Sequence, residues 1–154
     1  MLLVCNGIYY FLKPEYKNFI IEKLNVNVAV NIINLISPND PVIQKGKQIC
    51  NDSRSMLVAT GCDGMDGLFI VISAMIAFPM MLRKKILGTI AGIIVVYLTN
   101  LIRISGLYYV LKYKEAWFEF MHIYVGQFMV IFMGATFFFL WINSIEKKKI
   151  IAVE

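Results

Sequence analysis

Charged residues and histidine are scarce in this sequence. Of its 154 residues only 16% are charged and one is a histidine, whereas 59% are hydrophobic and 14% are aromatic. The mean hydropathy is +0.69. This balance is too apolar for an ordinary soluble domain with a single core, so an integral membrane protein is the leading class.

Paired cysteines are also missing. The three cysteines, Cys5, Cys50 and Cys62, show no Cys-x-x-Cys spacing. A structural zinc site or a thioredoxin-type redox pair would show that spacing, so the sequence predicts no metal site and no cofactor. The odd number leaves at least one free thiol.

The positive charge of the chain is concentrated in two clusters. The net charge is +5, and six of the fifteen Lys and Arg residues lie in Arg83–Lys85 and Lys147–Lys149, next to apolar runs. Such clusters act as topology anchors in membrane proteins, where they face the cytoplasm. We therefore expect a lipid bilayer as partner and no nucleic acid.

Three apolar runs are long enough to cross a bilayer. Its hydrocarbon core of roughly 30 Å needs about 20 helical residues, and Gly67–Leu82, Ile86–Ile102 and Ile123–Ile142 meet this with their flanks. Met1–Leu12 would cover only about 18 Å as a helix, so it is half a span, an interfacial anchor or the remnant of a longer helix. The predicted fold is an all-α integral membrane bundle of three spans and an incomplete fourth.

The rest of the N-terminal half is more polar. Tyr16–Ile36 mixes charged residues and asparagines with apolar ones, which is typical of a helix lying in the membrane interface, and Val42–Val58 predicts a small hairpin outside the bilayer. We expect one membrane domain over 1–154. It would comprise an N-terminal region (1–61), a catalytic transmembrane core (62–143) and a basic cytoplasmic tail (144–154).

Helix arithmetic places three reactive residues at one level. Cys62 lies 21 residues before Arg83, and Arg103 lies 20 residues after it, so each path crosses roughly 30 Å at about 1.5 Å per residue. His122 opens the third span from the same side. With the basic clusters in the cytoplasm, three helix ends would bring a cysteine, an arginine and the only histidine to the extracytoplasmic boundary, a catalytic geometry.

Cys62 lies among glycines just before an apolar helix. Taken alone, such a thiol is more often an inert small apolar residue. However, Gly61 and Gly64 allow close approach of a substrate backbone, and a position before a helix N-terminus favours the thiolate. Asp63 and Asp66 are most simply helix caps. They also oppose thiolate formation, so a nearby cation is needed.

Arg103 can supply that cation. An isolated arginine there would reach for lipid phosphates, but its apolar neighbours favour a side chain turned into the bundle, where the guanidinium suits an oxyanion. Asn100, on the same helical face, can orient the guanidinium or bind a substrate carbonyl. His122 alone would be a tolerated polar residue, but beside a thiol it is a candidate general base or acid.

Several landmarks follow one another at characteristic spacings within the three spans. They are Cys62-Asp63-Gly64, Ala77-Phe78-Pro79, Gly88 with Gly92, Asn100–Ile104 and Phe120–Val125. As an ordered set over Thr60–Asn143, they resemble the exosortase/archaeosortase family of membrane cysteine transpeptidases, most closely its short H-type exosortases.

The resemblance implies a function and a location. Cys62, Arg103 and His122 would form a catalytic triad in the cell's inner (cytoplasmic) membrane, acting at its outer face. The implied substrates are secreted proteins that end in a short motif, a transmembrane helix and a basic cluster. The thiolate would attack a peptide bond, release the C-terminal helix and leave a thioester for transfer to an unknown acceptor or to water.

A different class of protein also fits the residues. A non-enzymatic membrane assembly protein or transporter subunit would explain the small-residue pair Gly88 and Gly92 and the intramembrane arginine equally well. It does not predict thiol chemistry. Within the enzyme hypothesis, transfer to an acceptor and pure hydrolysis both stay open.

Overall fold

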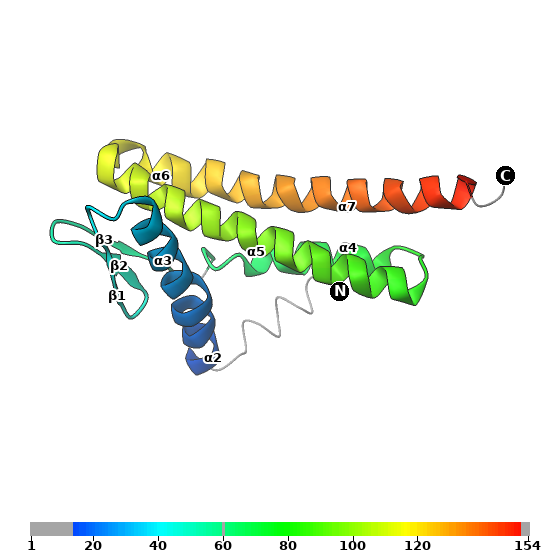
Figure 1. Ribbon diagram of the computed structural model, residues 1–154, viewed down its shortest axis with the longest axis horizontal. Helices are drawn as coiled ribbons and strands as arrows, with labels where there is room; N and C mark the ends of the chain where they lie inside the picture. Colours follow the sequence, from blue (N-terminus) through cyan, green and yellow to red (C-terminus); the bar gives the residue numbers. More distant parts are fainter. Residues whose placement is uncertain (1–13, 60, 152–154) are drawn as a thin grey trace.

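The structure is a computed structural model that describes residues 14–59 and 61–151, and most of these residues are helical (Figure 1). The predicted incomplete helix over Met1–Leu12 lies outside the described residues. The helices are α2 (Pro14–Phe19), the π-helical turn η1 (Ile20–Val26), α3 (Asn27–Ile36), α4 (Met65–Ala77), α5 (Leu82–Tyr113), the 3-10 turn η2 (Glu115–Trp117), α6 (Phe118–Phe120), the π-helical turn η3 (Met121–Val125) and α7 (Gly126–Ile151). The strands are β1 (Ile43–Lys45), β2 (Gln48–Cys50) and β3 (Ser55–Leu57).

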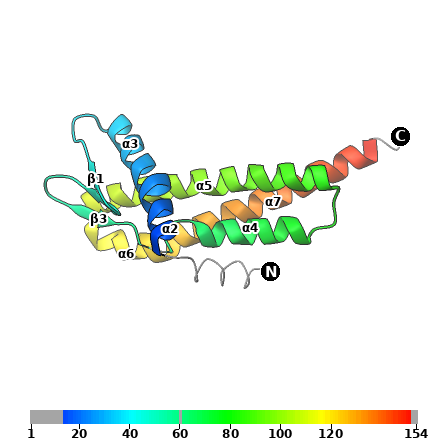
Figure 2. The same cartoon turned by 90° about the horizontal axis from the view of Figure 1, so that it is seen from below.

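Helices α4, α5 and α7 run side by side along the long axis of the molecule, as Figure 1 and Figure 2 show. The turn from α4 to α5 and the end of α7 lie at one end of this bundle, so the backbone brings the two basic clusters to the same end. The outer side of α5 carries apolar residues at every fourth position that are each at least half exposed: Ile86, Ile90, Ile94, Leu98 and Ile102. We call them the α5 stripe, and one continuous apolar face of this kind suits contact with lipid.

Among the described residues, three helical runs are long and apolar enough to cross a membrane, namely Glu15–Ile36, Leu82–Tyr113 and Glu115–Ile145. The predicted fold class, a helical membrane protein, is therefore confirmed. The last two runs contain the predicted spans Ile86–Ile102 and Ile123–Ile142.

The prediction of a helical span over Gly67–Leu82 is wrong in extent. Helix α4 has 13 residues, about 20 Å at the helical rise. It ends because Pro79 disfavours helical geometry at Phe78, which is extended. The four residues up to Met81 can add about 13 Å as extended chain, and the Lys85 ammonium caps the free Ile76 carbonyl at 2.7 Å. Helix α4 alone is therefore shorter than a hydrocarbon core of roughly 30 Å, and an extended segment joins it to α5.

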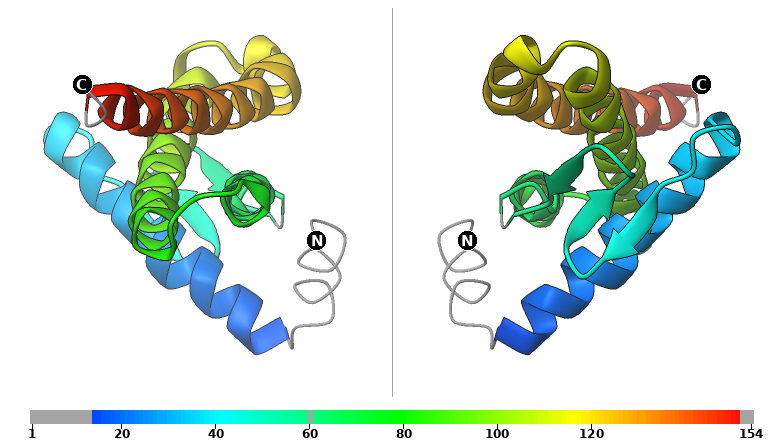
Figure 3. Two further views of the ribbon diagram at one scale, coloured as in Figure 1. Left: turned by 90° about the vertical axis from the view of Figure 1, so that its right-hand side faces the viewer. Right: turned by 90° about the vertical axis from the view of Figure 1, so that its left-hand side faces the viewer.

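The helix predicted over Tyr16–Ile36 is present, and by length and composition it qualifies as a span. It nevertheless runs across the long axis of the bundle (Figure 1, Figure 3). Its location in the membrane interface stays a prediction. Its inner face buries apolar side chains, among them Ile21 and Ile33, in one core with Ile104 and Tyr108 of α5.

The hairpin predicted over Val42–Val58 is a three-stranded antiparallel sheet in the order β1-β2-β3. Ile49 at its centre pairs with Gln44 on one side and Met56 on the other. Ile49 and Met56 join the core that α3 and α5 form. We call the transverse helix and this sheet, residues 14–59, the cap.

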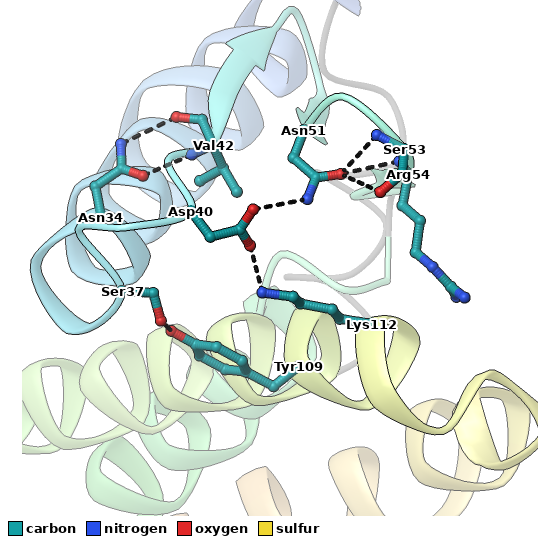
Figure 4. A network of polar contacts seen from close by, with 9 residues as sticks. All are labelled: Asn34, Ser37, Asp40, Val42, Asn51, Ser53, Arg54, Tyr109 and Lys112. Atoms are coloured by element: carbon teal, nitrogen blue, oxygen red, sulfur yellow. Dashed lines mark hydrogen bonds and ion pairs between the residues drawn. The ribbon is translucent and has the colours of Figure 1, made fainter.

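Polar contacts fasten the cap to the end of α5 (Figure 4). The Ser37 hydroxyl lies 2.7 Å from the Tyr109 hydroxyl. Asp40 accepts a hydrogen bond from Asn51 at 3.4 Å and forms an ion pair with Lys112. The Lys112 hydrogen bond lowers the pKa of the Asp40 carboxyl below its ordinary value. The cap and the last turns of α5 therefore form one body.

Glycines allow the three bundle helices to pack closely. A Cβ atom at Gly92 would lie 2.6 Å from the Val71 Cγ1 atom of α4, and one at Gly88 would lie 2.4 Å from the Trp141 Nε1 atom of α7. These distances are far below van der Waals contact. The small-residue pair Gly88 and Gly92 therefore lets α5 pack closely against α4 and α7.

We predict that Gly92→Ala lowers the thermal unfolding midpoint of the detergent-solubilised protein. The added methyl group must push α4 away from α5, and overpacking of this kind costs about 1–3 kcal/mol. Gly106→Ala is the matched control on the same helix, since a Cβ there meets nothing within 4 Å. An equal midpoint for the two variants would contradict the packing described.

Candidate active site

Cys62 lies in a tight turn between the cap and α4, and only 7% of its surface is exposed. Gly61 and Gly64 on either side have positive φ angles of 96° and 77°, which glycine adopts readily. The space beside Gly61 is open, whereas a Cβ at Gly64 would lie 2.8 Å from the Asn100 Cγ atom. Gly64 therefore packs the turn against α5 and leaves no room there for a substrate.

The structure brings the three predicted catalytic residues together. The Cys62 Sγ atom lies 3.3 Å from His122 Nε2 and 3.6 Å from Nδ1. The Arg103 Nη2 atom lies 4.0 Å from the same sulfur. These contacts join the turn before α4, the helix α5 and the turn η3, so the site depends on the tertiary fold.

His122 is held in place from two sides. Its ring stacks on the Phe118 ring, with centroids 5.6 Å apart and planes 5° from parallel. Its backbone carbonyl accepts a hydrogen bond of 3.3 Å from Arg103 Nη2. The imidazole therefore faces the thiol from a fixed position.

Arg103 lies inside α5, with its side chain turned into the bundle. Helix α5 continues for ten residues beyond it, about 15 Å at the helical rise, because these last turns pack against the cap. The arginine is 6% exposed. A Cβ atom at Gly126 would lie 2.6 Å from its Nε atom, so a glycine in α7 makes room for the guanidinium.

The hydrogen bonds of the Asn100 side chain run to the Cys62 turn and to η1. Its Nδ2 atom donates to the Cys62 carbonyl at 3.2 Å and to Asn25 Oδ1 at 3.1 Å. The side chain is 1% exposed, so a substrate does not reach it. Asn100 holds the turn that carries the thiol.

Asn25 is a site residue that sequence reasoning missed. It is 1% exposed, and its Nδ2 atom lies 3.5 Å from the Asp63 carbonyl and 3.3 Å from the Ile20 carbonyl. Ile20 begins η1, the π-helical turn that contains Asn25, and such turns are frequent at functional sites. Two asparagines, from η1 and α5, thus support the Cys62 turn.

Burial raises the pKa of the Cys62 thiol above its ordinary value. The Arg103 charge acts in the opposite direction, and the Asp63 charge raises the pKa further. Asp63 also caps α4, since its Oδ1 atom accepts from the Met65 backbone N–H at 3.3 Å. Burial and the Asp63 charge thus oppose the thiolate, whereas Arg103 favours it.

Comparison with known proteins gives the family. The family model for transmembrane exosortases matches residues 2–141. The chain belongs to the transmembrane exosortase family. No curated protein and no solved structure matched it.

Family membership and the long apolar helices together make this exosortase a multi-pass membrane protein. Membership also supports a general role as a membrane transpeptidase or protease. Within residues 14–59 and 61–151, no group of three or more His, Cys, Asp or Glu side chains could hold a metal ion.

We predict that Asp63→Asn shifts the alkylation of Cys62 by iodoacetamide to lower pH. Removing the carboxylate charge lowers the thiol pKa, so half-maximal rate is reached at lower pH, while the amide still caps α4. The rate is measured by mass spectrometry on protein carrying Cys5→Ser and Cys50→Ser. Asp66→Asn, in the same first turn, is the control and leaves the profile in place; identical shifts in both variants would refute the electrostatic account.

We predict that Asn25→Ala slows alkylation of Cys62 near neutral pH by about tenfold to a hundredfold, because a catalytic group displaced by about 1 Å loses activity on this scale. The variant loses the amide that supports the Cys62 turn. Asn31→Ala is the matched control, since Asn31 lies on α3 and bonds only to the exposed Asn27 side chain. If Asn25→Ala reacted at the rate of the unmodified chain, with an unchanged pH profile for Cys62, then Asn25 would not position the Cys62 turn.

Proposed function

We propose that this exosortase is a cysteine transpeptidase in which Cys62 is the nucleophile. The observation that carries the proposal is the 3.3 Å contact between its sulfur and His122 Nε2, with the Arg103 guanidinium 4.0 Å from the same atom. Nucleophile, base and cation lie within the distances that thiol catalysis needs. A non-enzymatic assembly protein has no use for this arrangement.

The reaction follows from these positions. His122 takes the thiol proton as the sulfur bonds to the carbonyl carbon of the scissile peptide. The carbonyl oxygen becomes an oxyanion that Arg103 stabilises, because the guanidinium keeps its charge and offers several donors. When the intermediate collapses, the C–N bond breaks, the leaving amine takes the proton from His122, and a thioester on Cys62 remains. An acceptor amine or water then releases the acyl group, with His122 as base.

The proposed substrates are secreted proteins with a C-terminal sorting signal, a short motif followed by a transmembrane helix and a basic cluster. The cap lies at the end of the bundle opposite the turn from α4 to α5 and the end of α7, which carry the basic clusters (Figure 1). The Cys62–Arg103–His122 cluster joins the turn between the cap and α4 to α5 and η3. If those clusters face the cytoplasm, as such clusters do, cleavage occurs at the outer face of the inner membrane.

We predict that Cys62→Ala and His122→Ala abolish processing of a secreted reporter that carries a sorting signal of this form from the same genome. Arg103→Lys should lower the rate about a hundredfold or more, since removing one oxyanion donor costs this much. Processing is followed by the reporter's mobility on gels, at equal enzyme levels.

Cys50→Ser is the matched control for this experiment. Cys50 is also a buried thiol, 6% exposed, but it lies in β2, outside the cluster. Its variant should process the reporter as the unmodified chain does. Near-normal processing by Cys62→Ala would end the proposal.

A further inference from the structure

An apolar pocket lies beside Arg103, between the C-terminal part of α5 and the segment formed by η3 and α7. Its volume is about 220 Å³. Gly106 lies on its α5 side, and Met121 and Met129 line it from the other side. Arg103 alone is charged among the described residues that line it. The pocket wall is therefore apolar, and Arg103 borders it while its Nη2 atom faces Cys62 and the His122 carbonyl.

The pocket has room for one large side chain. An apolar cavity of about 150 Å³ is enough to bind benzene. A Cβ atom at Gly106 would meet nothing within 4 Å, so this glycine leaves open space where any other residue would fill it. Met121 and Met129 are flexible and adapt to the shape of an apolar guest.

Arg103 connects the pocket with the proposed reaction centre. The same side chain lines the pocket and places its Nη2 atom 4.0 Å from the Cys62 sulfur. Met121, on the opposite wall, directly precedes His122. A peptide whose carbonyl oxygen faces Arg103 would therefore have the pocket within reach of the side chain on the same residue.

The pocket also reaches the lipid-facing side of the protein. Ile102 lines it and is the last member of the α5 stripe, with 67% of its surface exposed. A polypeptide anchored by a helix in the bilayer can approach along this stripe without crossing the cap. The site thus favours a membrane-anchored polypeptide as the source of the guest.

We propose that this pocket binds a large apolar side chain on the substrate residue whose carbonyl Cys62 attacks. The inference rests on the proposed function, and it names a specificity that the Cys62–Arg103–His122 cluster alone does not contain. A small or charged residue at that substrate position leaves the pocket unfilled or places a charge against its apolar wall.

The probes are N-acetyl-phenylalanyl chloromethyl ketone and N-acetyl-glycyl chloromethyl ketone, applied to the full chain with Cys5→Ser and Cys50→Ser in detergent micelles. The Cys62 sulfur bonds to the methylene carbon as chloride leaves, and the thiol proton passes through His122 to solvent. We expect the phenylalanyl ketone to react about tenfold or more faster, because burial of a large apolar side chain is favourable by at least this factor. Mass spectrometry gives both rates.

Two variants test the pocket in opposite directions. Gly106→Phe fills it and should reduce the ratio of phenylalanyl to glycyl rates towards one. Met129→Ala enlarges it and should favour a tryptophanyl ketone over the phenylalanyl one. Leu98→Phe is the matched control, because Leu98 lies on the same face of α5 outside the pocket and is 52% exposed; its ratio should equal that of the parent chain.

The outcomes separate the two proposals. The pocket proposal would be overturned if the phenylalanyl and glycyl ketones reacted at equal rates while labelling still needed His122. The proposed role of Cys62 as nucleophile would then stand. Equal rates are the result expected if the pocket holds only lipid. Labelling of Cys62 that is unaffected by His122→Ala would overturn the proposed function itself. A ratio that responds to Gly106→Phe and not to Leu98→Phe supports the pocket.

Discussion

The buried guanidinium of Arg103 is the constraint around which the site is arranged. A charge removed from water is costly unless polar groups receive its hydrogens. Here η3 turns the His122 carbonyl towards it, the Cys62 turn brings the sulfur, and Gly126 lets α7 approach closely enough to enclose it. The carbonyl carries no net charge, and burial opposes a charge on the sulfur. In the proposed reaction, a developing oxyanion would add the negative charge that these two partners do not provide.

Two π-helical turns serve this arrangement in the same way. In η1 the Ile20 carbonyl receives the Asn25 amide, and in η3 the His122 carbonyl receives the Arg103 guanidinium. A π-helical turn is a poor helix, and it usually marks a functional position. In both turns a side chain of the site satisfies a backbone carbonyl. The protein thus gives up regular helix in the two segments that carry Asn25 and His122.

The level of the three reactive residues could be predicted because it depends only on helical rise and on the positions of the basic clusters. Other features depend on partners that the sequence does not specify. In the sequence, nothing distinguishes Asn25 from the exposed Asn31. Only the fold brings the Asn25 side chain to the Asp63 carbonyl. Strands of three residues carry too little alternation to be counted, so the sheet was expected as a single hairpin. Pro79 lies inside an apolar run. The hydropathy of this run predicts a span over Gly67–Leu82, but the proline ends the helix at Ala77.

The short helix α4 also has a consequence for the surrounding lipid. Its 13 residues match only about two thirds of a hydrocarbon core of roughly 30 Å, and extended backbone is not stable when exposed to acyl chains. Lys85, bound to the Ile76 carbonyl, brings an ammonium group to the end of this helix. We therefore expect a bilayer around this protein to be thinner beside α4, as bilayers are next to short spans. The hydrocarbon core would then be thinner beside α4 than beside α5. A transmembrane helix of ordinary length in another protein would therefore fit the bilayer better beside α5 than beside α4.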